Sequence, residues 1–253
     1  MKIQLVSDAH LLMDHVFNAL NPDADLFIIA GDLAASPAIA KKVLTKIRKQ
    51  TDIPIIYVLG NHEYYTLNLY TAIDVYKKVL ARIKNLYILE QEGVELGGVC
   101  FWGTTLWSDL SDPMAALTVQ RALMDYEMIE KAPGEPIKAI DTQGKYLQSV
   151  KWLTEKLEAN TSCQNVVITH HAPCWACRDT QFDYDSNNRW VTCGFCNRLD
   201  ALMHKYSISH WFYGHTHKSF KFRVGETQIV SNQMGLRHEQ KHSGFNPRLL
   251  IEI

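Results

Sequence analysis

Residues 26–32 read LFIIAGD, a short apolar run that stops at a glycine and an aspartate. Two further aliphatic runs, residues 3–6 and 53–59, have the length and β-branched content of buried strands. A helical pattern fills the gap between the second and third runs. Ser36 suits an N-cap, Pro37 suits the first helical position, and apolar residues recur at helical spacing after them. Strands separated by such a helix predict parallel neighbours in one sheet.

The rest of the chain continues this mixture of strands and helices. We expect helices over 69–83, 140–157 and 197–206, hairpins turning at Gly97–Gly98 and Gly225–Glu226, strands over 165–169, 210–213 and 248–253, and a loop at 131–136. Two strand-rich halves with flanking helices indicate two sheets packed against each other. We therefore predict an α/β fold, a four-layer α/β/β/α sandwich of two mixed sheets packed face to face with helices outside, as a single domain over residues 1–253.

Composition and charge narrow the class of protein. The formal net charge is -1, so there is no electrostatic case for long nucleic acid or a membrane surface as partner. No apolar run approaches the roughly 20 residues of a spanning helix, and MKIQLVSDAH has no leader pattern, so we expect a cytoplasmic protein. In that compartment we expect the six cysteines to be free thiols or metal ligands and not disulfides. We expect Cys100 and Cys163 to be buried or incidental thiols.

Five short polar clusters each follow a predicted strand: DAH (8–10), GD (31–32), GNHE (60–63), THH (169–171) and GHTH (214–217). Loops at strand ends are where α/β proteins usually build active sites. Imidazole and carboxylate together suit zinc, manganese, iron or a similar divalent ion. Each cluster alone is weak, because GD is common in turns and histidine pairs are common on surfaces. Five of them in this order, all at strand ends, predict one metal centre.

The ordered set D-x-H, GD, GNH followed by an acid, a later H, and GHxH resembles the calcineurin-like metallophosphoesterases. The resemblance runs from Asp8 to His217, nearly the whole chain. The stretches GTTLWSD (103–109) and GFNPRLLIEI (244–253) also resemble a poorly characterised bacterial branch of that family. The resemblance implies a phosphoesterase with two divalent metal ions, Mn, Fe, Zn or similar, that hydrolyses a phosphate ester by in-line attack of a metal-bridging hydroxide.

The same resemblance implies a role for each matching residue. One metal ion would be held by Asp8, His10 and His217, the second by Asn61, His170 and His215, with Asp32 bridging both and His62 facing the leaving group. The choice of His170 over His171 as the metal ligand rests on the family pattern, because strand periodicity alone cannot decide between two adjacent residues. Glu63 either orients nearby groups or is an ordinary surface acid.

Three functional interpretations remain open at this stage. The first is hydrolysis of a small phosphorylated substrate. The second is a phosphodiesterase or nuclease acting on cyclic nucleotides or short nucleic acid, because a fold does not fix a substrate. The third is a non-catalytic scaffold, which the complete set of motif residues disfavours. The natural substrate, the physiological metals and the oligomeric state do not follow from the sequence.

A second cysteine-based motif lies beside the first. Cys174, Cys177, Cys193 and Cys196 form CxxC, fifteen residues, CxxC, a spacing typical of a four-thiolate zinc site. This departs from the family branch, in which small polar residues are common in this stretch. We therefore predict a cysteine-rich loop insertion at 172–196 that a structural zinc ion would hold in place. The alternative is four reduced thiols in a loop.

Three further residues are candidates for substrate binding. Arg178 and Arg189 lie within the cysteine-rich segment, and guanidinium groups bind phosphate bidentately. His238, with Arg237 and His242 near it, follows the last predicted hairpin at the rim of the expected pocket. An exposed position without a ligand is the alternative for each of them.

Overall fold

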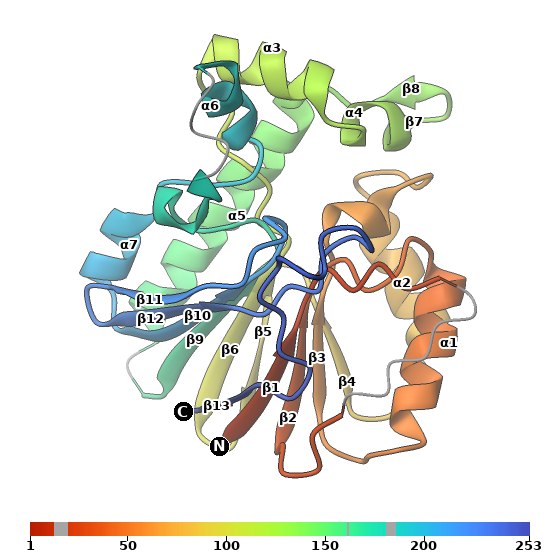
Figure 1. Cartoon of the computed structure of the whole chain (residues 1–253), viewed down its shortest axis with the longest axis vertical. Coiled ribbons are helices and arrows are strands. Elements are labelled where there is room, and N and C mark those ends of the chain that lie inside the picture. The colour runs from red at the N-terminus through yellow and green to blue at the C-terminus, as the bar shows by residue number, and fades with distance from the viewer. Residues whose placement is uncertain (13–19, 161, 181–185) are drawn as a thin grey trace.

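The computed structural model describes residues 1–12, 20–160, 162–180 and 186–253. Its first sheet has the order β13-β1-β2-β3-β4, with β13 antiparallel to β1 and the other neighbours parallel. These strands are β1 (Lys2–Val6), β2 (Leu26–Ala30), β3 (Ile55–Val58), β4 (Leu86–Leu89) and β13 (Leu250–Glu252). The first and last strands of the described chain are therefore neighbours, and the two termini lie together in Figure 1.

The second sheet has the order β11-β12-β10-β9-β6-β5, in which the four inner strands are parallel and both edge strands are antiparallel. Its strands are β5 (Glu92–Leu96), β6 (Val99–Thr104), β9 (Gln164–Thr169), β10 (Ile208–Tyr213), β11 (Lys221–Val224) and β12 (Thr227–Ser231). Both predicted hairpins are present, since β5–β6 turns at Gly97–Gly98 and β11–β12 turns at Gly225–Glu226.

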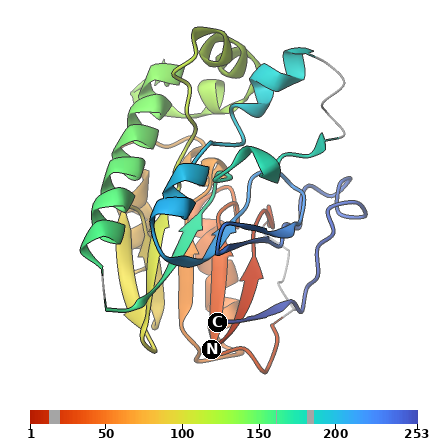
Figure 2. The same cartoon turned by 90° about the vertical axis from the view of Figure 1, so that its left-hand side faces the viewer.

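Helices cover the outer faces of both sheets. In Figure 1, α1 (Pro37–Arg48) and α2 (Ala72–Leu80) lie against the first sheet, while α5 (Ala139–Ala159) and α7 (Asp200–Lys205) lie against the second. Figure 2 shows α5 running along the outside of the second sheet. The predicted four-layer sandwich of two mixed sheets is confirmed. Among the described residues, no helix is both long and apolar enough to span a bilayer.

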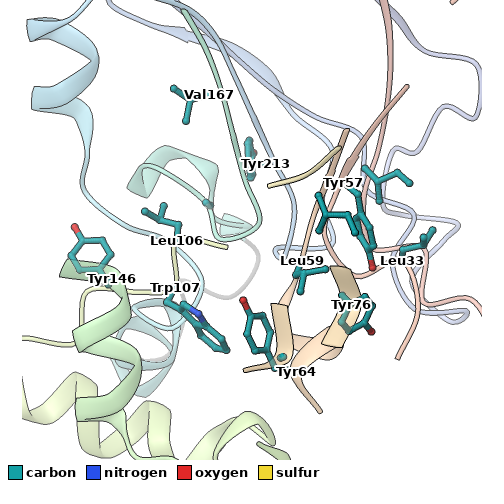
Figure 3. Close-up of a cluster of buried hydrophobic side chains, with 14 of the residues drawn as sticks. Leu33, Tyr57, Leu59, Tyr64, Tyr76, Leu106, Trp107, Tyr146, Val167 and Tyr213 are labelled. Atoms are coloured by element: carbon teal, nitrogen blue, oxygen red, sulfur yellow. The ribbon is translucent and has the colours of Figure 1, made fainter. Parts of the chain in front are cut away.

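The side-chain alternation of β2 explains the layers. Leu26, Ile28 and Ala30 belong to the cluster of buried side chains between the sheets. Phe27 and Ile29 point the other way and join the second cluster, under the helices. Because both faces of β2 are covered, its sequence is apolar at every position. The outer cluster includes residues of strands from both sheets, and Figure 3 shows part of it.

Several short elements were not predicted from the sequence. They are the edge strand β4, α3 (Pro113–Ala122), α4 (Asp125–Met128), α6 (Ser186–Thr192) and the single turns η1 (Asn61–Tyr64) and η2 (Trp175–Cys177). The segment 131–136, predicted as a loop, contributes to a small hairpin of β7 (Glu130–Ala132) and β8 (Glu135–Pro136). In Figure 1, α3, α4 and α6 lie together above one end of the sandwich.

Cys100 and Cys163 form a disulfide, so the prediction that they are buried or incidental thiols is wrong. Cys100 lies on β6 and Cys163 directly precedes β9. These two strands are parallel neighbours, and their register brings together residues that are 63 positions apart. Because disulfides are rare in a reducing cytoplasm, the bridge weakens the reasoning behind a cytoplasmic location, which stays a prediction.

Candidate metal centre

The predicted ligands lie in loops after the C-terminal ends of parallel strands in both sheets. Asp8 follows β1, Asp32 follows β2 and Asn61 follows β3. His170 follows β9 and His215 follows β10 in the other sheet. A hydrogen bond joins the two sets, because the His215 N–H donates to Asp8 Oδ1 at 2.9 Å. The packing of the two sheets therefore brings motifs from both halves of the chain to one place.

The structure gathers the predicted ligands into two groups. In each group, one donor atom from every residue lies within 4.8 Å of the others; the groups are Asp8, His10, Asp32 and His217, and Asp32, His170 and His215. Asn61 extends the second group, because its Oδ1 lies 2.9 Å from His170 Nε2. Asp32 alone belongs to both. This is the grouping that the family resemblance implied, although the binding of metal ions by these residues stays a prediction.

The backbone at these positions is strained. Five of the predicted ligands have φ between 43° and 73°, in the left-handed region: Asp8, His10, Asp32, His215 and His217. A non-glycine residue there costs of order 1–3 kcal/mol, and such residues concentrate at functional sites. All five residues belong to the two donor groups. Backbone strain therefore coincides with the predicted metal centre.

Two glycines leave the space that the ligands occupy. A Cβ atom on Gly31, whose φ is +86°, would lie 2.1 Å from His170 Nδ1. A Cβ atom on Gly60 would lie 2.1 Å from Asp32 Oδ1. Both contacts are far too short, so any side chain at either position would displace a predicted ligand. Steric exclusion of any larger side chain therefore explains the glycines of the GD and GNH motifs.

Charge in the centre is concentrated on Asp32 and its histidine neighbours. Burial alone would raise the pKa of Asp32, but His170 and His62 outweigh it and hold the pKa well below its usual range. Burial lowers the pKa of His170, whereas the nearby negative charge of Asp32 raises it, to a net value of about 10. His170 Nε2 lies 3.4 Å from Asp32 Oδ2. The carboxylate is therefore an anion that attracts positive charge.

Unpaired atoms show that the site suits divalent cations. Asp8 Oδ2, Asp32 Oδ2 and His215 Nε2 are buried without a hydrogen-bond partner. Buried polar atoms normally have one, and a bound cation would supply the missing partner of these three. His10 Nε2 and His217 Nε2 also lie 3.0 Å apart and point at each other. Carboxylate and neutral imidazole directed at one point are the ligands that zinc, iron and manganese accept.

His62 lies at the opening of the centre. Its backbone N–H donates to Asp32 Oδ1 at 3.0 Å, and its Nε2 lies 3.9 Å from Asp32 Oδ2. The imidazole side chain is 29% exposed, compared with 1% for the carboxylate of Asp32. One face of its ring stacks on Tyr65, with ring centroids 4.5 Å apart. The residue is thus held beside the predicted ligands with one side open to solvent.

Glu63 is fully buried, so the alternative of an ordinary surface acid is excluded. Its carboxylate accepts hydrogen bonds from the backbone N–H groups of Asp32, Gly60 and Ala34 and from the hydroxyl of Tyr57. Burial and the charge of Asp32 raise its pKa to about 7. The side chain ties the GD loop to the GNHE loop and so fixes Asp32 relative to Asn61.

Asp125 of α4 is a buried neighbour that the sequence did not reveal. Its Oδ1 accepts hydrogen bonds from Asn61 Nδ2 and from the Tyr65 hydroxyl, both at 2.8 Å. With its nitrogen engaged in this way, the Asn61 amide must direct Oδ1 toward His170. Tyr65 in turn supports His62 by stacking. Asp125 lies 64 residues from Asn61 and belongs to no motif, which is why only the structure identifies it.

Replacing Asp125 by leucine is expected to weaken the binding of the second metal ion by about 10- to 100-fold, because the Asn61 amide loses the acceptor that orients it. Asp125→Asn should restore most of the affinity, since both donors use one oxygen, which the amide retains. Manganese titration followed by calorimetry measures this. If both variants lose equal affinity, or neither does, Asp125 does not position Asn61.

Two more residues support the histidines. Glu239 Oε2 lies 2.6 Å from His217 Nδ1, which leaves Nε2 facing the centre. His171 is buried outside both groups, where its Nδ1 lies 3.2 Å from Thr105 O and its ring packs against His215. Burial and the charge of His170 lower the pKa of His171 to about 3, so it is neutral. Neither role carries a local sequence signal.

The remaining candidates do not belong to either donor group. Arg178 lies over the Trp175 ring, and Arg189 lies over Trp190 and lines a cavity of about 260 Å³. His238 is exposed, next to Glu239. Their roles in substrate binding stay predictions. So does the loop insertion at 172–196, part of which, 181–185, falls outside the described residues.

The four clustered cysteines are only partly assembled. Cys174 Sγ and Cys177 Sγ lie 3.4 Å apart. Cys196 is buried nearby, and Cys193 is partly exposed. Among the described residues, the sets of three or more donor atoms within 4.8 Å of one another include none of these four sulfurs. A four-thiolate site is therefore not preformed, and zinc binding stays a prediction.

Comparison with known proteins agrees with the geometry. The sequence model of the calcineurin-like phosphoesterases matches residues 1–219. The chain is 32% identical over 225 residues to "Uncharacterized protein L509" of Acanthamoeba polyphaga mimivirus, covering 84% of this chain and 78% of that protein.

Two solved structures are similar in fold. One is the phosphopantetheinyl hydrolase PptH from Mycobacterium tuberculosis, with a TM-score of 0.75 at 15% identity, covering 100% of this chain and 95% of that one. The other is the protein TT1561 of Thermus thermophilus, with a TM-score of 0.52 at 12% identity, covering 92% and 88%. At these identities the likeness concerns the fold alone. With the family match and the arrangement of aspartates and histidines together, the chain belongs to the calcineurin-like phosphoesterase family and is a metal-dependent hydrolase of phosphate esters.

Proposed function

We propose that the protein hydrolyses a small phosphorylated substrate at a dinuclear centre of divalent ions, Mn, Fe, Zn or similar. Asp8, His10 and His217 would hold one ion, with Asp32 shared. Asn61, His170 and His215 would hold the other. The pair of cations would neutralise the phosphate oxygens and lower the pKa of a water molecule, which attacks phosphorus in line.

The observation that carries this proposal is the shared position of Asp32. It is the single member of both donor groups, and one of its oxygens is buried without a hydrogen-bond partner. A carboxylate with two oxygens can bind one ion with each and so hold two ions close together. The other groups act around it: Glu63 fixes the loop of Asp32, and Asp125 orients Asn61.

His62 completes the arrangement on the open side. Charge develops on the oxygen that leaves phosphorus, and a donor placed there supplies a proton or a hydrogen bond. Its partial exposure allows that side of the centre to admit a substrate. The stacking on Tyr65 limits the rotation of the imidazole ring, so that its Nε2 remains near Asp32.

Metal removal tests the proposal. Treatment with a chelator is expected to abolish hydrolysis of an aryl phosphomonoester, and addition of manganese to the chelated protein should restore it. Phosphodiesters and cyclic nucleotides assayed in parallel would show whether the alternative of diester hydrolysis applies. Activity that survives complete metal removal would contradict the proposal. Two tightly bound ions without turnover on any of these substrates would favour a non-catalytic scaffold.

A further inference from the structure

The two CxxC segments lie side by side in the fold. Ala172, just before the first segment, forms an isolated parallel bridge with Cys196 at the end of the second. The Ala172 N–H donates to Phe195 O at 3.1 Å, and the Asn197 N–H donates to Ala172 O at 2.9 Å. The Leu199 N–H donates to Pro173 O at 2.9 Å. Backbone pairing therefore holds the two segments in register before any ligand binds.

The first segment already has the geometry of a thiolate ligand loop. The Cys177 N–H donates to Cys174 O at 3.1 Å, closing a tight turn that places the two sulfurs 3.4 Å apart. The Cys174 sulfur lies within hydrogen-bonding reach of the Cys177 thiol and of the backbone N–H groups of Ala176 and Cys177. Donors that stabilise a thiolate favour metal binding, because the thiolate is the ligand.

The second segment contributes two further cysteines. Cys196 is only 4% exposed, and its sulfur is near enough to Cys174 for their charges to interact. Cys193 precedes it by three residues, and a turn in which the Cys196 N–H donates to Thr192 O joins them. Buried thiols without a cation have little tendency to ionise, and a bound cation would reverse this.

We propose that Cys174, Cys177, Cys193 and Cys196 bind one structural zinc ion, separate from the catalytic pair. Zn–S bonds of about 2.3 Å in a tetrahedron place neighbouring sulfurs about 3.8 Å apart, close to the spacing already present in the first segment. Cys193 and Cys196 complete the set when their side chains close on the ion. Four thiolates leave no open position, so this ion has a structural role.

The zinc ion would stabilise one wall of the catalytic centre. Phe195, between the two cysteines of the second segment, stacks on His215 with ring centroids 4.7 Å apart. The Asn197 side chain donates to Trp107 O at 2.9 Å and accepts from the Asp109 N–H at 2.9 Å. Fixing the second segment therefore fixes an aromatic contact with a predicted catalytic ligand and the loop after β6.

Metal analysis of the full-length protein, purified with reductant, tests the site. The wild type is expected to keep one zinc ion per chain after mild chelation that removes the catalytic metals. Cys177→Ser/Cys193→Ser should lose that ion, whereas the matched control Cys100→Ser/Cys163→Ser should retain it. Asp32→Asn should show the opposite pattern, losing catalytic metal and keeping the zinc ion. Substituted cobalt should give the intense absorption of a tetrahedral thiolate site.

A measurement on the wild type covers the case in which the double variant does not fold. Titration of the thiols with an organomercurial is expected to release one zinc ion for every four thiols modified. The proposal is overturned if the protein retains no zinc after mild chelation or if Cys177→Ser/Cys193→Ser leaves the zinc content unchanged.

Discussion

Replacing Asp32 with asparagine is expected to lower kcat on a phosphate ester by about 10³-fold, at saturating manganese. The side chain keeps its shape, so the fold should be preserved, and the amide oxygen still accepts from the backbone of His62. What is lost is the negative charge that both donor groups share. The content of catalytic metal should fall with the activity, from two ions per chain to one or fewer, as measured by mass spectrometry.

Asp23→Asn is the matched control for this variant. It makes the same chemical change at an exposed position, and both turnover and metal content should match the wild type. Thermal unfolding of the metal-free proteins would show whether Asp32→Asn folds normally. Full turnover with both ions bound in Asp32→Asn would mean that the carboxylate does not bridge, and the dinuclear proposal would fail.

Replacing His62 with glutamine is expected to reduce kcat by about 10²-fold for an alkyl phosphate. The reason is that an alkoxide is a poor leaving group and needs a proton donor, which glutamine does not replace. For an aryl phosphate with a stable leaving anion the loss should be less than about tenfold, because little proton transfer is needed. The ratio of the two losses, measured with one enzyme preparation, distinguishes a proton donor from a structural residue.

His204→Gln is the control for this comparison, since His204 is exposed on α7. It should leave both rates unchanged. An equal loss for alkyl and aryl substrates in His62→Gln would contradict the assignment of His62 to the leaving group. Metal content should remain at the wild-type level in His62→Gln, because His62 belongs to neither donor group.

The sequence predicted the regular layers of the fold because their signals are local. β2 and β3 are apolar on both faces, and α1 has its N-cap, with Ser36 Oγ accepting from the Ile39 N–H at 3.3 Å. α3 was missed although it has a similar start, with Asp112 as its N-cap and Pro113 as its first residue, because its apolar pattern is weak. Met114 and Leu117 are exposed, and only Ala115 and Val119 of that helix are buried, so its apolar pattern has no clear face.

The candidate site likewise contains residues that the sequence revealed and residues that only the structure revealed. Each predicted ligand belongs to a short motif with a fixed spacing, so it could be found without knowing how the strands pair. Asp125 and Glu239 could not, because each contacts a predicted ligand only after distant segments have packed. The Cys100–Cys163 disulfide was missed for the same reason, since it depends on β6 and β9 being neighbours.

Anomalous diffraction from crystals soaked in manganese tests the central claim most directly. The account predicts two peaks, one on each side of the Asp32 carboxylate, with Asp8, His10 and His217 around one peak and Asn61, His170 and His215 around the other. A map without metal at Asp32, or with a single ion that Asp32 does not contact, would contradict it.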